Sequence, residues 1–192
     1  MRTSFPLLIA PLLLATPLAA QPPASDSARL VVMKDGAPVG TEDFAFRSGN
    51  GEDAIRFVAT TTGGTDPLRV AVTTTPRRLT MRVASGTGEV AREYPGGPRS
   101  VVADERVLSL YALLALVQPG PVIVHGPPPG GRRDGTLEDG GTAPMPNGGP
   151  PARRLTLRSG EDIVRVWLDG GGRLLRVEIP SRGLSAERVI RP

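Results

Sequence analysis

The chain has 192 residues, a formal net charge of +4 and no cysteine. Without cysteine there can be no disulfide, no thiolate metal site and no cysteine nucleophile. The only histidine, His125, argues against His-pair metal sites and the usual serine triad. The small charge excess gives no sign of nucleic-acid binding, and no P-loop or Gly-x-Ser-x-Gly motif occurs. We therefore expect no catalytic residue, no metal site and no cofactor.

Residues 1–20 have the pattern of a secretory leader. Arg2 supplies a positive charge, an apolar run extends from Phe5 to Leu18, and Ala19-Ala20-Gln21 provides a small-residue cleavage site. The run contains prolines and is shorter than the ~20 apolar residues of a membrane-spanning helix. We expect the leader to be removed and the mature protein to be periplasmic or secreted, with no transmembrane segment.

The rest of the chain is expected to form one β domain over residues 29–192, after a flexible, proline-rich lead-in at 21–28. Short runs that alternate apolar and polar residues, separated by Gly, Pro and Asp-Gly turns, predict antiparallel strands. These runs cover residues 30–34, 39–47, 54–62, 68–75, 77–84, 122–125, 153–158, 162–169, 173–179 and 184–190. The predicted fold class is mainly β: a single curved antiparallel sheet of eight to ten strands that forms a half-barrel.

One helix is predicted from Glu105 to Val117, with Asp104 as its N-cap. Its apolar residues extend around almost the whole circumference, so it cannot lie freely on the surface. We expect the sheet either to enclose this helix completely or to be closed by it over a concave cavity.

The segment 126–151 consists almost wholly of Gly, Pro and polar residues, which predicts a disordered insertion. Within it, Asp134, Glu138 and Asp139 alternate with glycines as in a calcium-binding loop, but without the spacing or flanking helices of an EF-hand. We expect a solvated loop. If the protein were an unfamiliar hydrolase, a third hypothesis beside the two given below, these three carboxylates would be the best candidates for its catalytic residues.

Trp167 is predicted to lie on the face of its strand opposite Val164, Val166 and Leu168. We expect the helix to pack on the tryptophan face, so that Trp167 is either covered by the helix or forms one wall of a ligand cavity. The candidate ligand-binding residues are Phe44, Phe46, Leu110, Tyr111, Leu114 and Trp167.

Four short patterns occur in order along the chain: residues 35–44 (Asp-Gly-Ala-Pro-Val-Gly-Thr-Glu-Asp-Phe), 108–111 (Leu-Ser-Leu-Tyr), 166–169 (Val-Trp-Leu-Asp) and 174–177 (Leu-Leu-Arg-Val). They resemble a group of periplasmic β-sheet proteins of unknown function, related in shape to the LolA-type lipoprotein carriers. The resemblance implies a curved sheet around a helix, with an acyl chain or another apolar partner on its concave side, and no catalytic residues. The insertion and the scarcity of aromatic residues depart from that pattern.

Two main hypotheses result. The first is a non-enzymatic envelope protein that binds a lipid-like ligand or an envelope partner on its concave face. The second is a structural or protein-interaction module without a ligand cavity. Lipid that co-purifies with the protein would favour the first, and a protein cross-link without lipid would favour the second.

Overall fold

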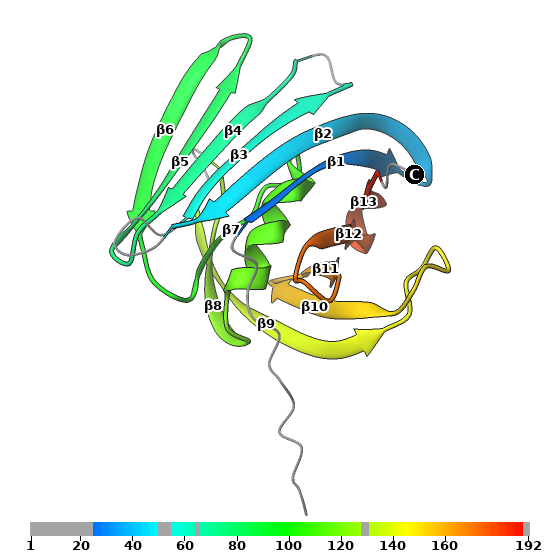
Figure 1. Cartoon of the computed structure of the whole chain (residues 1–192). Helices are drawn as coiled ribbons and strands as arrows, with labels where there is room; N and C mark the ends of the chain where they lie inside the picture. The colour runs from blue at the N-terminus through cyan, green and yellow to red at the C-terminus, as the bar shows by residue number, and fades with distance from the viewer. Residues whose placement is uncertain (1–24, 50–54, 64–65, 128–130, 190–192) are drawn as a thin grey trace, which may run out of the picture.

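The computed structural model describes residues 25–49, 55–63, 66–127 and 131–189, so the expected leader and residues 21–24 of the lead-in lie outside the described residues. Thirteen strands form one sheet in the order β6-β5-β4-β3-β2-β1-β13-β12-β11-β10-β9-β8-β7. The sheet curves around a central helix into a nearly closed barrel (Figure 1). The expectations of eight to ten strands and of a half-barrel are therefore both wrong, although the mainly β class is confirmed.

All ten expected strands are present, within a few residues of their predicted bounds. The strands are β1 (Ser25–Lys34), β2 (Ala37–Ser48), β3 (Ile55–Thr62), β4 (Arg69–Thr74), β5 (Arg78–Ser85), β6 (Gly88–Pro95), β7 (Ser100–Val102), β8 (Gly120–His125), β9 (Arg132–Ala143), β10 (Ala152–Ser159), β11 (Asp162–Leu168), β12 (Leu174–Ile179) and β13 (Leu184–Arg188). The described residues also form two 3₁₀ helices, η1 (Leu108–Leu116) and η2 (Pro180–Arg182).

The β1–β2 hairpin forms at Asp35-Gly36, as predicted. Both residues have positive φ, 50° and 81°, and this left-handed pair gives the tight turn that matches the twist of the flanking strands. Residues 25–28 pair with β2, and the buried carboxylate of Asp26 accepts a hydrogen bond from the backbone N–H of Leu174 (2.9 Å). Residues 25–28 are thus strand, and the expectation of a flexible lead-in is wrong for them.

Strands β6, β7 and β9 are missing from the prediction because they show no alternating apolar pattern. On β6 only Tyr94 is buried. β9 carries Leu137 and Ala143 as its buried residues, yet its first half (132–137) pairs with β8 and its second half (136–143) pairs with β10. Backbone pairing with these two neighbours holds β9 in place, so the expected disordered insertion at 126–151 is wrong for residues 132–143.

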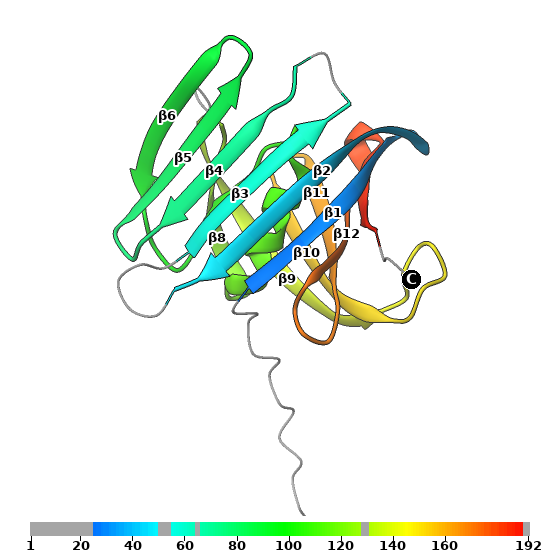
Figure 2. The ribbon, with the colours of Figure 1, turned by 45° about the horizontal axis from the view of Figure 1, so that its top comes forward.

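The helix η1 lies inside the barrel, between the β1–β6 half of the sheet and the β8–β13 half, in both views (Figures 1 and 2). It begins at Leu108 rather than Glu105, and eight of its nine residues are buried. The chain reaches the interior through a β7–η1–β8 crossover, which makes β7 and β8 parallel, while every other strand pair is antiparallel. Of the two expected arrangements, the structure has the one in which the sheet encloses the helix.

Successive side chains along each strand point alternately into the barrel and away from it. Val164, Val166 and Leu168 face the helix with the main hydrophobic core, while Trp167 faces outward. A register shift between Trp167 and Leu168 places Leu174, not Leu175, in the core opposite Leu168. The expectation that the helix packs on the tryptophan face is therefore wrong, because the aliphatic face is the one that the helix covers.

The two edge strands of the sheet, β6 and β7, lie at the seam of the barrel. There Tyr94 of β6 packs against His125 of β8, with ring centroids 4.6 Å apart. The Tyr94 hydroxyl donates a hydrogen bond to the carbonyl of Gly126 (2.6 Å). Side-chain contacts therefore connect the two ends of the sheet, where β6 and β7 are not paired with each other.

Candidate functional site

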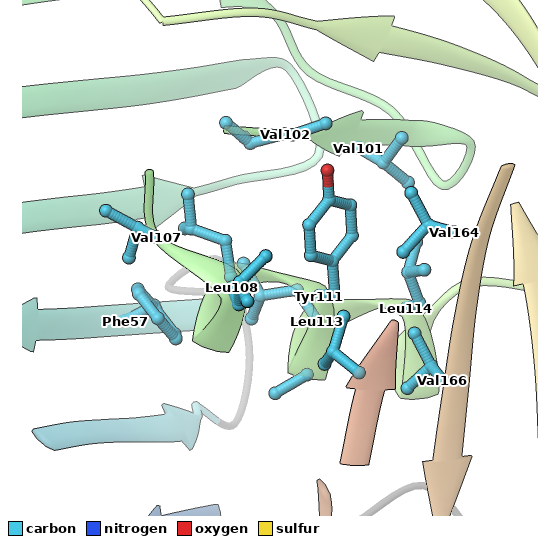
Figure 3. Close-up of a cluster of buried hydrophobic side chains, with 14 of the residues drawn as sticks. Phe57, Val101, Val102, Val107, Leu108, Tyr111, Leu113, Leu114, Val164 and Val166 are labelled. Carbon is cyan, nitrogen blue, oxygen red and sulfur yellow. The ribbon is translucent and has the colours of Figure 1, made fainter. Parts of the chain in front are cut away.

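Five of the six candidate ligand-binding residues belong to the main core. Phe44, Phe46, Leu110, Tyr111 and Leu114 are each at most 4% exposed. Tyr111 is the one of the six that borders either of the two cavities at the ends of η1. Figure 3 shows its ring rising from the helix with the hydroxyl directed toward Val101 and Val102 of β7. The other four fill the interior.

Trp167 lies in a small separate cluster on the outer face of the barrel. It packs against Met145, Ala152 and Leu175, so the β9–β10 connection covers it. The indole is 3% exposed. Trp167 therefore anchors this connection, and it does not border the cavities beside the helix.

An apolar cavity of about 260 Å³ lies at the C-terminal end of η1. It opens between the end of the helix and the ends of β3, β4, β5 and β7. Its walls are mainly apolar side chains, joined by two threonines, a serine and the prolines of two loops. The lining residues are Ile55, Val72, Thr74, Thr75, Pro76, Leu79, Gly97, Pro98, Ser100, Val101, Val102, Leu113, Leu116 and Val117.

Two loops form the mouth of this apolar cavity. In the β4–β5 turn, the backbone N–H of Thr75 donates to the carbonyl of Arg78 (2.7 Å), and the N–H of Arg78 donates to the Thr75 hydroxyl (3.0 Å). The β6–β7 loop lies against this turn, with the N–H of Gly96 donating to the carbonyl of Arg77 (2.9 Å). A Cβ at Gly96 would lie 2.3 Å from the backbone nitrogen of Arg78. Only glycine allows this close approach.

A second cavity, of about 270 Å³, lies at the N-terminal end of η1 and has a charged mouth. Its inner walls include Tyr111, Val124, Leu157, Val164 and Ile179. Burial raises the pKa of the Tyr111 hydroxyl, so this group stays protonated at neutral pH. We refer to this space as the charged cavity.

Ion pairs cross the mouth of the charged cavity. Arg133 of β9 pairs with Asp162 of β11 (3.2 Å), and Arg182 of η2 lies 3.9 Å from Asp162 and 3.4 Å from Glu105. Four separate segments are thus linked through one chain of alternating charges. Three arginines and three carboxylates line the cavity, so it offers no net charge to a ligand.

Glu42 holds the start of η1. Its carboxylate accepts hydrogen bonds from the backbone N–H groups of Leu108 (2.8 Å) and Ser109 (2.7 Å), which have no partner within the helix. The side chain comes from β2 and is 1% exposed. Burial raises the pKa of the Glu42 carboxyl, and the nearby charge of Asp104 adds to this effect. Asp104 itself is paired with Arg106 (2.8 Å).

The acidic residues singled out in the sequence do not converge. Glu138 pairs with Arg158 (3.0 Å) and Asp139 with Arg153 (2.8 Å), both across the β9–β10 ladder. Within the described residues, no group of three or more His, Cys, Asp or Glu side chains has the arrangement of a metal site.

Over the same part of the chain, no helix has the length and apolar character needed to cross a bilayer.

Comparisons with known proteins identify no family. No family model and no curated protein matches the sequence. The chain is similar to a solved structure titled "Crystal Structure of Beta-barrel-like Protein of Domain of Unknown Function DUF1849 from Brucella abortus", with a TM-score of 0.48 and 8% identity, over 89% of this chain and 98% of that chain. A likeness at this level establishes no function. The resemblance to LolA-type carriers stays a prediction.

Sequence reasoning missed both Glu42 and the apolar cavity. A glutamate that shares one strand face with Phe44 and Phe46 is a signal for a buried, partnered carboxylate, because lone charges are rarely buried. The cavity has no comparable signal, since its walls come from four separate segments of the chain, at 55, 72–79, 97–102 and 113–117.

Proposed function

We propose that this protein is exported to the periplasm, is not an enzyme, and binds one apolar chain of a lipid-like ligand in the apolar cavity. The lining of that cavity carries the proposal. Leu113, Leu116 and Val117 of the helix end face Val72 and Leu79 of the sheet across an open space. Burial of a ligand chain against such walls is favourable by roughly 25 cal/mol per Å² of apolar surface removed from water.

The size of the apolar cavity limits the ligand. At about 260 Å³ it lies just below the ~300–1,000 Å³ of typical pockets for drug-sized molecules. It suits one acyl chain better than the several chains of a lipoprotein. We therefore extend the expected LolA-type relationship only to the mode of binding, an acyl chain held between helix and sheet, and not to a lipoprotein cargo.

A second candidate function is a structural or protein-interaction module. The packed interior favours it, because Leu108, Leu110 and Leu114 of η1 are at most 1% exposed and belong to the main hydrophobic core. In that case the apolar cavity would hold an apolar side chain of an envelope partner, or no ligand.

Lipid extraction tests the proposal. Protein purified from its native compartment is expected to release one acyl-chain lipid per molecule, measured by mass spectrometry. Thr74→Trp, which fills the cavity from the inner face of β4, is expected to remove that lipid. Thr73→Trp is the matched control, because Thr73 is exposed on the same strand and should leave the lipid bound. A folded wild-type protein free of lipid, with a cross-link to a protein partner, would favour the second candidate.

A further inference from the structure

Two arginines stand next to residues that line the apolar cavity. Arg77 stands in the β4–β5 turn between the lining residue Pro76 and Arg78, and Arg99 stands in the β6–β7 loop between Pro98 and Ser100, which also line the cavity. The hydrogen bond from Gly96 to the Arg77 carbonyl holds the two loops together. The two arginines thus stand in neighbouring loops beside the cavity, although neither is itself one of the residues that line it.

Neither arginine is used elsewhere in the described part of the chain. Both side chains are exposed, and no hydrogen bond or ion pair joins either guanidinium to another described residue. Arg78, next to Arg77, pairs with Glu93 (3.2 Å), which is the carboxylate that the described residues contribute to this end of β5 and β6. The β2–β3 connection at 50–54, which contains Glu52 and Asp53, is outside the described residues.

The arginines at the two cavities differ in whether they have a carboxylate partner. At the charged cavity each arginine already has a carboxylate partner, whereas Arg77 and Arg99 are paired with no described carboxylate. A guanidinium presents a planar fork of donors that fits carboxylate and phosphate oxygens. An anion at this mouth would complete a contact that the protein leaves open.

The helix fixes the orientation of the ligand. Residues of the C-terminal end of η1 line the apolar cavity, and the last carbonyl groups of a helix carry partial negative charge. An anionic group inside the cavity would be repelled and desolvated. The apolar end of the ligand must therefore lie inside, with the anionic end at the mouth.

We propose that the ligand of the apolar cavity is an anionic amphiphile with one acyl chain, whose head group is held by Arg77 and Arg99. This inference rests on the proposed function and specifies its ligand. The shared chemistry is one chain with a carboxylate or phosphate head, which fits both a free fatty acid and a lysophospholipid.

Calorimetric titration with decanoate, decyl phosphate and decan-1-ol, at neutral pH and low salt, tests the proposal. We expect the wild-type protein to bind the anions about fivefold more tightly than the alcohol, because each exposed charge contact contributes roughly 0.2–1 kcal/mol. The preference should shrink as salt is added. The tighter of the two anions distinguishes a fatty acid from a phosphate-bearing source.

Two double variants localise the effect. Arg77→Gln with Arg99→Gln should remove the preference for the anions and leave the affinity for the alcohol unchanged. Arg69→Gln with Arg82→Gln removes the same charge from exposed positions on β4 and β5 and should keep the preference. Equal binding of anion and alcohol by the wild type, or a preference that survives in the first variant, overturns the inference while the proposed function stands. If none of the three probes binds, the proposed function fails as well.

Discussion

The two ends of η1 are held in different ways. At its start, Glu42 binds two backbone N–H groups from a buried position, and ion pairs link the surrounding segments. At its end, the last turn of the helix contains no basic residue, and the backbone N–H of Val117 donates a hydrogen bond to the carbonyl of Leu114 (3.1 Å). The comparison suggests a division of roles: the polar end fixes the helix in the barrel, and the apolar end leaves space for a ligand.

The largest expected effect on stability comes from a substitution in the middle of η1. Leu110 is fully buried, and Leu110→Asp would place a carboxylate in the core without a partner, at a cost of several kcal/mol. We expect the domain to unfold or aggregate, as measured by circular dichroism and thermal melting. Normal melting would show that the interior is not packed around η1.

Removal of the carboxylate at the polar end should have the next largest effect. Glu42→Ala leaves two buried N–H groups without an acceptor and should lower the free energy of unfolding by about 3 kcal/mol. Glu42→Gln keeps one acceptor oxygen and should lower it by less. Chemical denaturation measures both. Equal stability of Glu42→Ala and the wild type would show that Glu42 does not stabilise the start of η1.

The pH dependence of Glu42 gives a finer test of the same end. Burial raises its pKa above the ordinary value of 4.5, so the folded protein retains a proton that the unfolded chain has already lost. The contribution to stability is therefore complete below the unfolded pKa and falls as pH rises through the folded pKa. The difference in unfolding free energy between the wild type and Glu42→Gln should shrink with rising pH over this window. A difference that grows over the same window would contradict the burial argument.

The smallest effect on stability is expected at the apolar end. Leu116 is only half-buried and lines the apolar cavity, so Leu116→Ala should lower the free energy of unfolding by about 1 kcal/mol. Affinity for decanoate should nevertheless fall, because the variant removes part of the cavity wall. Calorimetry measures the affinity and denaturation the stability. Unchanged affinity with reduced stability would assign Leu116 to packing alone.

Strands in which every second side chain is buried can be predicted from the sequence. Strands without this alternation are missed. On β4 and β5, Val70, Val72, Leu79 and Met81 are buried at every second position. β9 is missed because backbone pairing with two neighbours, rather than its own side chains, holds it. A deletion of residues 130–149, which the expected disorder would tolerate, would instead remove β9 from between β8 and β10.

The candidate site is predicted less well than the fold. The enclosed helix follows from its uniform apolar character, and Tyr111 does border a cavity. Trp167 is misplaced because a tryptophan can be buried on the outer face when a loop covers it, here through Met145. The apolar cavity depends on where the β4–β5 turn and the β6–β7 loop meet, which no local pattern reveals.

A methyl NMR titration with decanoate tests the ligand assignment most directly. We predict saturable shifts confined to the methyl groups of Val72, Val101, Leu113, Leu116 and Val117 around the apolar cavity. Shifts centred instead on Val124, Val164 and Ile179 of the charged cavity, or no shift at all, would contradict it.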